Sequence, residues 1–213
     1  MKSMERKALF TIGHSNHSWE QFVRLLKLHK VTTLCDVRSV PHSRMNPQFD
    51  CETLKRGLRE AGIFYVFLGK ELGGRSEDPA CCDNGKVLYE RLAATSLFRK
   101  GIQRVEEGIK RKHRIALMCA EREPLECHRS ILIGRQLDAL GITVLHIHAD
   151  GQLEDQKTAL QRLLRQLNLL DANMFRSRED VIADAYRLQG NRIAYDWGSS
   201  EHLEGAATRR AAG

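Results

Sequence analysis

The chain has 213 residues, of which 42% are hydrophobic, and this length is typical of one folded domain with a substantial core. Its 34 Lys and Arg residues exceed its 27 Asp and Glu residues, and the formal charge of +7 favours acidic partners such as nucleotides or nucleic acid. Six cysteines without an apolar leader argue against a secreted disulfide scaffold, and no apolar run approaches the ~20 residues of a membrane helix. We therefore expect a cytoplasmic protein with free thiols and no membrane partner.

Short β-rich runs alternate with helical patterns along the first 150 residues. In chain order we expect a strand at 8–12, a helix capped by Ser18 and Gln21, a strand at 31–37, a helix at 50–61 followed by Gly62, a strand at 63–68, two helices within 88–109 separated near Thr95, a strand at 115–119, a helix at 127–140 and a strand at 142–147. Such alternation, with apolar strands buried on both faces, predicts a parallel sheet with right-handed crossovers. The predicted fold class is α/β, a doubly wound, mainly parallel five-stranded sheet of the Rossmann-like type.

The chain after residue 150 is predicted to be a helical extension. Helical patterns cover 155–170 and 179–188, and a stripe of leucines in the first should pack on the core or on a second subunit, which would make the protein a homodimer. We divide the chain into an α/β core domain at 1–150 that carries the site, a helical C-terminal extension at 151–204 and a mobile tail at 205–213, which lacks periodicity.

Polar clusters follow the ends of four successive predicted strands. In open parallel sheets, ligands bind beyond the carboxyl ends of the strands, so these clusters should line one pocket. The clusters are His14, Ser15 and Asn16 after the first strand, Asp36, Arg38, Ser43 and Arg44 after the second, Gly73, Gly74 and Arg75 after the third, and Cys119 and Glu121 after the fourth.

Four strings of this sequence are similar to one family. They are TIGHSN at 11–16, DVRSVPHSRMNPQF at 36–49, LGGR at 72–75 and CAEREPLECHR at 119–129. In this order and spacing they resemble the family called domain of unknown function 488, over roughly residues 8–150. The resemblance implies a shared site at these strings, without implying a particular activity.

Basic residues around the predicted site favour an anionic ligand. The helix expected to start at 127 would point backbone N–H groups and its positive dipole end into the site, and the planar fork of arginine suits phosphate or carboxylate. An anionic small molecule or nucleic acid is therefore the expected partner, unless the arginines only brace loops by pairing with Asp36 and Glu121. The candidate anion-binding residues are Arg38, Arg44, Arg75, His128 and Arg129.

Cys119 is the candidate nucleophile. A free cysteine at a strand end is commonly a small apolar filler, but Arg122, His128 and a nearby helix start would lower the pKa of its thiol and favour the thiolate. Cys127 could act as a resolving thiol or be an inert neighbour. The acid–base candidates are Glu121, Asp36 and His14.

Three functions follow from this pattern. An enzyme acting on a phosphate-bearing or nucleobase-related substrate is favoured, with its reaction class unknown, because a nucleophile, acids and cations cluster together. A second candidate is a ligand- or nucleic-acid-associated sensing module that binds without turnover. A third is a zinc or iron site built from His14, Cys119, Cys127 and His128. Closely spaced ligand pairs are lacking and the arginines would oppose a dication, so we assign no residue to a metal, and the sequence identifies no cofactor.

Overall fold

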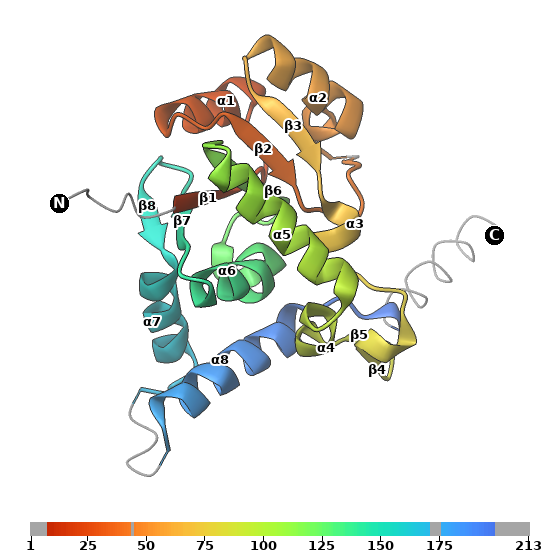
Figure 1. The fold of residues 1–213 in the computed structure, drawn as a ribbon, viewed down its shortest axis with the longest axis vertical. Helices are drawn as coiled ribbons and strands as arrows, with labels where there is room; N and C mark the ends of the chain where they lie inside the picture. The colour runs from red at the N-terminus through yellow and green to blue at the C-terminus, as the bar shows by residue number, and fades with distance from the viewer. Residues whose placement is uncertain (1–7, 44, 171–175, 199–213) are drawn as a thin grey trace, which may run out of the picture.

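A six-stranded sheet forms the centre of the computed structural model, which describes residues 8–43, 45–170 and 176–198 (Figure 1). The strand order is β3-β2-β6-β1-β7-β8, and β8 is the one of these six that runs antiparallel to its neighbour. The strands are β1 (Ala8–Gly13), β2 (Thr33–Asp36), β3 (Phe64–Phe67), β6 (Ile115–Cys119), β7 (Thr143–Ile147) and β8 (Leu153–Asp155). Helices cover both faces, so the predicted α/β, Rossmann-like class is confirmed. The sheet has one strand more than the predicted five because β8 turns back along β7.

The strand order brings together three strand ends that are distant in the sequence. β6 lies between β2 and β1 and pairs in parallel with both. Gly13 at the end of β1 is opposite Cys119, and Asp36 at the end of β2 is opposite Met118. The loops that follow these three strands therefore leave the same edge of the sheet side by side.

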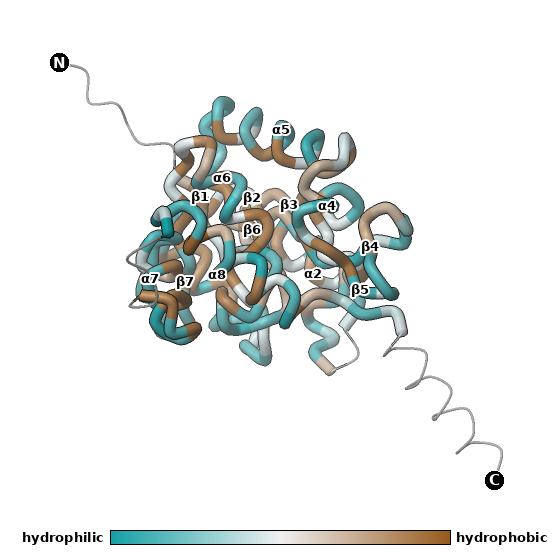
Figure 2. Tube along the Cα trace, turned by 90° about the horizontal axis from the view of Figure 1, so that it is seen from below, coloured by the Kyte–Doolittle hydropathy of each residue, from teal (hydrophilic) through white to brown (hydrophobic). Residues whose placement is uncertain are grey.

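The central strands alternate their side chains between two hydrophobic cores, as the two-residue period of a strand requires. In β6, Met118 joins the core beneath α1 (Trp19–Leu28) and α2 (Cys51–Glu60), whereas Leu117 and Cys119 face the other core. Hydrophilic and hydrophobic segments alternate along α5 in Figure 2, as expected of a helix that covers a core with one face. The helices on this second core are α4 (Tyr89–Ala93), α5 (Ser96–Lys110), α6 (Arg135–Ala139), α7 (Gln156–Gln166) and α8 (Arg178–Ile193).

Helices begin and end where short local signals predict. Ser18 caps α1 and accepts a hydrogen bond from the backbone N–H of Gln21 at 3.2 Å, and Thr95 caps α5 in the same way. Gly62, just past α2, has a φ of +76°. The Ser18 cap, the helix end at Gly62 and the break near Thr95 are therefore confirmed, and such signals are predictable because a cap or a left-handed glycine acts over only a few residues.

Two elements differ from their predicted form. The strand predicted at 63–68 as buried on both faces is β3 at the sheet edge, where Phe64 is 67% exposed. The helix predicted at 127–140 begins with a π-helix at Arg129–Gly134, which α6 continues. The remaining short elements are α3 (Gly69–Leu72), the hairpin of β4 (Cys82–Asp83) and β5 (Lys86–Val87), and 3-10 turns at Pro47–Phe49, Pro79–Cys81 and Pro124–Glu126.

α7 and α8 bury side chains in the same core as the sheet. Leu163 and Leu164 of α7 and Ala185 and Tyr186 of α8 belong to the core cluster that contains Cys119. The predicted tail at 205–213 lies outside the described residues. Among the helices described, none has the length and apolar character needed to cross a membrane.

Candidate functional site

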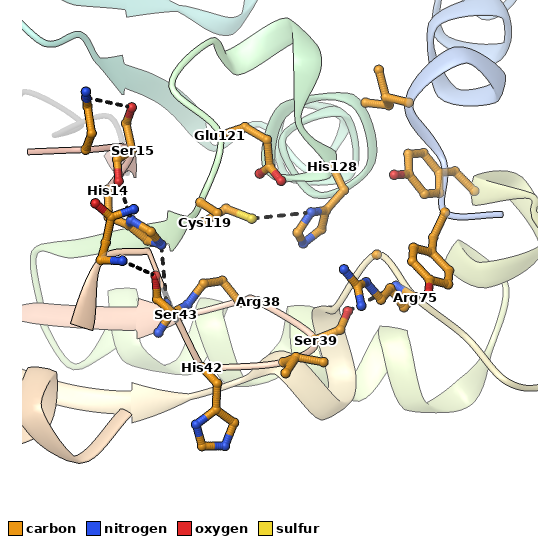
Figure 3. Close-up of a pocket in the computed structure, with 18 residues that line it drawn as sticks. His14, Ser15, Arg38, Ser39, His42, Ser43, Arg75, Cys119, Glu121 and His128 are labelled. Atoms are coloured by element: carbon orange, nitrogen blue, oxygen red, sulfur yellow. Dashed lines mark hydrogen bonds between the residues drawn. The ribbon is translucent and has the colours of Figure 1, made fainter. Parts of the chain in front are cut away.

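A polar cleft of about 640 Å³ opens at the carboxyl ends of β1, β2 and β6. Figure 3 shows Cys119, Glu121 and His128 gathered near one another, with Arg38 beneath them and Arg75 to one side. The structure brings most of the predicted site residues to this cleft. Those that line it are His14, Ser15, Asn16, Arg38, Gly74, Arg75, Cys119, Glu121 and His128, together with Ser43.

The loops after β1 and β6 run against each other beyond the sheet. The backbone N–H groups of His14 and Ser15 donate to the carbonyls of Cys119 and Ala120 at 2.8 and 2.9 Å. A Cβ at Gly13 would lie 1.9 Å from the Glu121 carbonyl oxygen, so this close approach requires glycine. Backbone pairing thus holds His14 beside the strand end that carries Cys119.

Asp36 lies beneath the cleft and holds Arg38 in place. Its carboxylate is fully buried and accepts from Arg38 Nε at 2.9 Å, from Arg38 Nη2 at 2.7 Å and from the Tyr65 hydroxyl at 3.0 Å. It does not line the cleft. The structure therefore corrects the prediction of Asp36 as an acid or base facing a substrate, since it is the buried partner that orients a guanidinium.

His14 supports the same arginine from the other side. Its Nδ1–H donates to the Ser15 carbonyl at 2.9 Å, so the Nε2 lone pair faces Arg38 Nη1 at 3.3 Å, and the ring stacks on Phe49. Burial lowers the pKa of His14 to about 4, and the charge of Arg38 acts in the same direction. A neutral ring held in this way is better suited to orienting Arg38 than to donating a proton.

Two thiols, an imidazole and a carboxylate form a cluster at the floor of the cleft. Cys119 Sγ lies 3.7 Å and Cys127 Sγ lies 3.8 Å from His128 Nδ1. Cys127 Sγ also lies 2.9 Å from Glu121 Oε2. Donor atoms from all four residues lie within 4.8 Å of one another, and this set has the chemistry to bind a metal ion. Cys127 is 1% exposed and lies behind the cleft wall rather than in it.

The pKa values of the two thiols are shifted in opposite directions. Burial raises the pKa of Cys127, but the hydrogen bond with Cys119 and the positive charges of Arg129 and His128 outweigh burial and hold this pKa well below its ordinary range. The hydrogen bond with Cys127, followed by burial, raises the pKa of Cys119 well above its ordinary range. The pKa of Cys127 is thus shifted toward the thiolate and that of Cys119 away from it, and the assignment of Cys119 as the nucleophile stays a prediction.

Arg129 braces a loop and does not face the cleft. It is fully buried, and its Nη1 and Nη2 donate to the carbonyls of Glu121 and Arg122. This corrects the prediction that its guanidinium binds an anion and matches the alternative in which an arginine braces a loop. The π-helical start at Arg129 likewise replaces the regular helix start that was expected to bind an anion.

The two glycines of the LGGR string have different positions. Gly74 lines the cleft, and a Cβ there would lie 2.9 Å from His128 Cγ, so glycine lets the chain pass this ring. Gly73 does not line the cleft and packs against Ser39. Arg44 lies outside the described residues.

The end of α8 and the residues just after it form one side of the cleft, through Ile193 and Tyr195. The sequence analysis did not predict this contribution. The Arg75 guanidinium lies 4.2 Å above the Tyr195 ring, and Trp197 Nε1 donates to the Ser76 carbonyl at 2.8 Å. In the sequence, the signal for this part of the cleft was the presence of two aromatic residues, Tyr195 and Trp197, in a polar segment. The cleft residues that the prediction missed are Ser39, Val40, His42, Asn46, Tyr89, Ala120, Ile193 and Tyr195.

Comparison with known proteins identifies the family of this chain. Searches of curated proteins and of solved structures gave no significant match. A family model described as domain of unknown function DUF488 matches residues 18–135, which is more than half of the 213 residues. This match includes the strings that supply Asp36, Arg75, Cys119 and His128 to the site. The chain therefore belongs to the DUF488 family.

Proposed function

We propose that this protein is an enzyme that binds a phosphate-bearing substrate, such as a nucleotide, in the cleft and acts on it beside the thiol cluster. The observation that carries this proposal is the juxtaposition of Arg38 and Arg75 with Cys119, Glu121 and His128 around one cavity. A volume of about 640 Å³ is in the range of small-molecule sites, which commonly span ~300–1,000 Å³.

Arg75 is the residue best placed to capture the anion. Its side chain is exposed, stacks on Tyr195, and has no acidic partner within salt-bridge distance among the described residues. Stacking restricts the plane of the guanidinium while leaving its N–H donors available, which lowers the entropy lost when an anion binds. Arg38 is already paired with Asp36, so it contributes a rigid polar surface rather than a full positive charge.

The cluster on the opposite side supplies reactive groups at the bound substrate. Cys119, Glu121 and His128 all line the cleft and offer a thiol, a carboxyl group and an imidazole. Burial raises the pKa of Glu121, with Cys127 acting in the same direction, so this carboxyl is suited to proton transfer closer to neutral pH than an ordinary glutamate. A binding module would not require such a group beside its ligand.

The test is a panel of nucleotides, sugar phosphates and inorganic phosphate, assayed by thermal shift and then by mass spectrometry for turnover. We expect Arg75→Ala to weaken binding of a hit by about 10- to 100-fold, the range for a charge-assisted hydrogen bond. Arg99→Ala is the matched control, because Arg99 is an exposed arginine on α5 outside the cleft. Glu121→Gln should retain binding and lose turnover. Binding without turnover by the unmodified protein would favour the sensing module.

A further inference from the structure

The thiol cluster has the spacing of a metal site rather than that of a set of neutral hydrogen bonds. Tetrahedral zinc with bonds of ~2.3 Å to sulfur and ~2.0 Å to nitrogen places these two ligand atoms about 3.5 Å apart. The two Sγ–Nδ1 distances to His128 are 3.7 Å and 3.8 Å, from Cys119 and Cys127 respectively. One imidazole nitrogen thus has two sulfur atoms at nearly equal distance, although a single lone pair can accept only one thiol proton well.

His128 is oriented as a metal ligand would be. Its Nε2 lies 3.0 Å from the Val37 carbonyl, which can only accept, so Nε2 carries a proton, and in the neutral form of the ring the Nδ1 lone pair faces the two sulfurs. Histidines that bind metals commonly donate their second N–H to a carbonyl or carboxylate in this manner. Gly74 packs against the His128 ring, and a Cβ at this position would crowd the ring, so glycine allows His128 to adopt this orientation.

The nearby arginines do not prevent a cation from binding in the cluster. Arg129 directs Nη1 and Nη2 to backbone carbonyls, and Arg38 forms its ion pair with Asp36. Among the described residues, no Arg or Lys forms a salt bridge with Glu121. Arg129 keeps its positive charge, but two thiolates and one carboxylate carry three negative charges, which more than balance a divalent cation, so the objection that the sequence raised against a dication is weaker in the folded site. Without a cation, the contact of 2.9 Å between Cys127 Sγ and Glu121 Oε2 requires a shared proton.

We propose that Cys119, Cys127 and His128 bind one divalent transition-metal ion, Zn²⁺ in the first instance, and that Glu121 is the fourth ligand on the cleft side. Two sulfurs, one nitrogen and one oxygen suit tetrahedral zinc. All four donors lie within 4.8 Å of one another, and ligand atoms of tetrahedral zinc are about 3.5 Å apart, so the widest pairs close by up to about 1.3 Å and the Cys127–Glu121 pair, at 2.9 Å, opens by about 0.6 Å. This set replaces the His14-containing one, because His14 Nε2 faces Arg38 instead.

The exposed position of Glu121 gives the site a replaceable ligand. The two cysteines and His128 are buried, whereas Glu121 is exposed at the cleft. Catalytic zinc sites keep three protein ligands and leave one position for water or substrate, and Glu121 lies where such an exchange would occur. A bound ion there would polarise a phosphoryl oxygen or lower the pKa of a water molecule. The inference deepens the proposed function, and it is tested without any substrate.

The first measurement is the metal content of the tag-free protein, purified without chelator and analysed by plasma mass spectrometry. We expect one zinc per chain, either as purified or after incubation with Zn²⁺ and desalting. Replacement by Co²⁺ should produce a thiolate-to-cobalt charge-transfer band and the visible bands of tetrahedral cobalt. Absence of bound zinc after incubation, together with absence of the charge-transfer band, would overturn the proposal.

Measuring the Zn²⁺ affinity of substituted proteins shows which side chains bind the ion. Loss of an outer-sphere partner typically lowers metal affinity 10- to 100-fold, so we expect Cys119→Ser, Cys127→Ser and His128→Gln each to lower Zn²⁺ affinity by more than about 100-fold. Glu121→Gln should retain the ion and lower the affinity less. Cys81→Ser is the matched control, because Cys81 is a buried free thiol outside the cluster, and it should retain wild-type affinity. Wild-type affinity in both cysteine variants would refute this ligand set.

Thiol alkylation of the unmodified protein keeps the proposal testable if a ligand variant fails to fold. Chelator should increase the labelling of Cys119, which lines the cleft, at least 10-fold, and Zn²⁺ should reverse this increase. Labelling of Cys119 that is independent of chelator would contradict the proposal. Arg75→Ala should bind Zn²⁺ normally, so failure of the phosphate-binding proposal and failure of the metal proposal are distinguishable.

Discussion

His146 on β7 is completely buried and is bonded through both ring nitrogens. Nδ1 lies 2.8 Å from Thr11 Oγ1, and Nε2 lies 2.9 Å from Gln156 Oε1. The Gln156 amide donates to the Ser130 carbonyl and to the Tyr186 hydroxyl, so its oxygen is the atom that faces His146. This oxygen can only accept, and Nε2 therefore carries the single proton of a neutral ring. The network joins β1 and β7 to α7, α8 and the π-helix.

The neutral ring makes stability depend on pH. Burial lowers the pKa of His146 to about 4, and the charge of Arg129 acts in the same direction. In the unfolded chain the pKa of a histidine is ~6.5, so the unfolded state takes up a proton as the pH falls while the native state does not. Titration of His146 should lower the free energy of unfolding by about 2 kcal/mol between pH 7 and pH 5. Its full contribution, reached once the pH is below both pKa values, is about 3 kcal/mol. The effect is small above pH 7 and complete below pH 4.

His146→Gln removes this titration and allows the effect to be measured. We expect the variant to be less stable at pH 7 by about 1–3 kcal/mol, because a buried hydrogen bond is lost or distorted. Its deficit relative to the unmodified protein should shrink by about 2 kcal/mol at pH 5. Urea unfolding followed by circular dichroism at pH 7, 6 and 5 gives both quantities. The other histidines are present in both proteins, so their contributions cancel. A deficit that stays constant with pH would refute this reasoning.

Three further substitutions, two of them with a control substitution, test the packing around the cleft and the C-terminal helices, each by urea unfolding. Asp36→Asn should cost about 3–5 kcal/mol because it leaves a buried guanidinium without its counter-ion, and a cost below 1 kcal/mol would contradict this pairing. Gly13→Ala should cost about 3 kcal/mol or more, since its Cβ would meet a carbonyl oxygen, whereas Gly141→Ala should cost about 1 kcal/mol from its φ of +76° alone. Leu163→Ala should cost about 2–5 kcal/mol and the exposed Leu170→Ala less than about 0.5 kcal/mol, and equal costs would show that α7 does not pack as described.

Most element types and several helix boundaries were predictable because their determinants are local. The Ser18 cap, the helix break near Thr95, the glycine at 62 and the strand at 115–119 all depend on neighbouring residues and on short periodicity. The polar residues at strand ends were predictable for a related reason, since parallel strands direct their carboxyl ends to one edge. These two local rules were enough to predict most of the residues around the cleft.

The orientation of each site side chain required the tertiary structure. Arg38, Arg75 and Arg129 have the same chemistry in the sequence, but one is paired with a buried carboxylate, one stacks on Tyr195 and one binds backbone carbonyls. Only Tyr195 is distant from its arginine in the chain, whereas the partners of Arg38 and Arg129 lie within eight residues of them. Sequence spacing records which residues follow a strand, but it does not record the direction in which a long side chain turns.

The amino-acid sequence alone determined the α/β class, the local helix signals and the residues that gather at the strand ends. The strand order, the return of β8 along β7 and the position of Tyr195 in the cleft were decided by long-range packing. The thiol cluster shows the same division. Cys119, Glu121, Cys127 and His128 are within ten residues in the sequence, but only the turn at Pro124–Glu126 and the Val37 carbonyl bring their donor atoms within 4.8 Å of one another. Such contacts depend on three-dimensional neighbours, for which a linear pattern contains no signal.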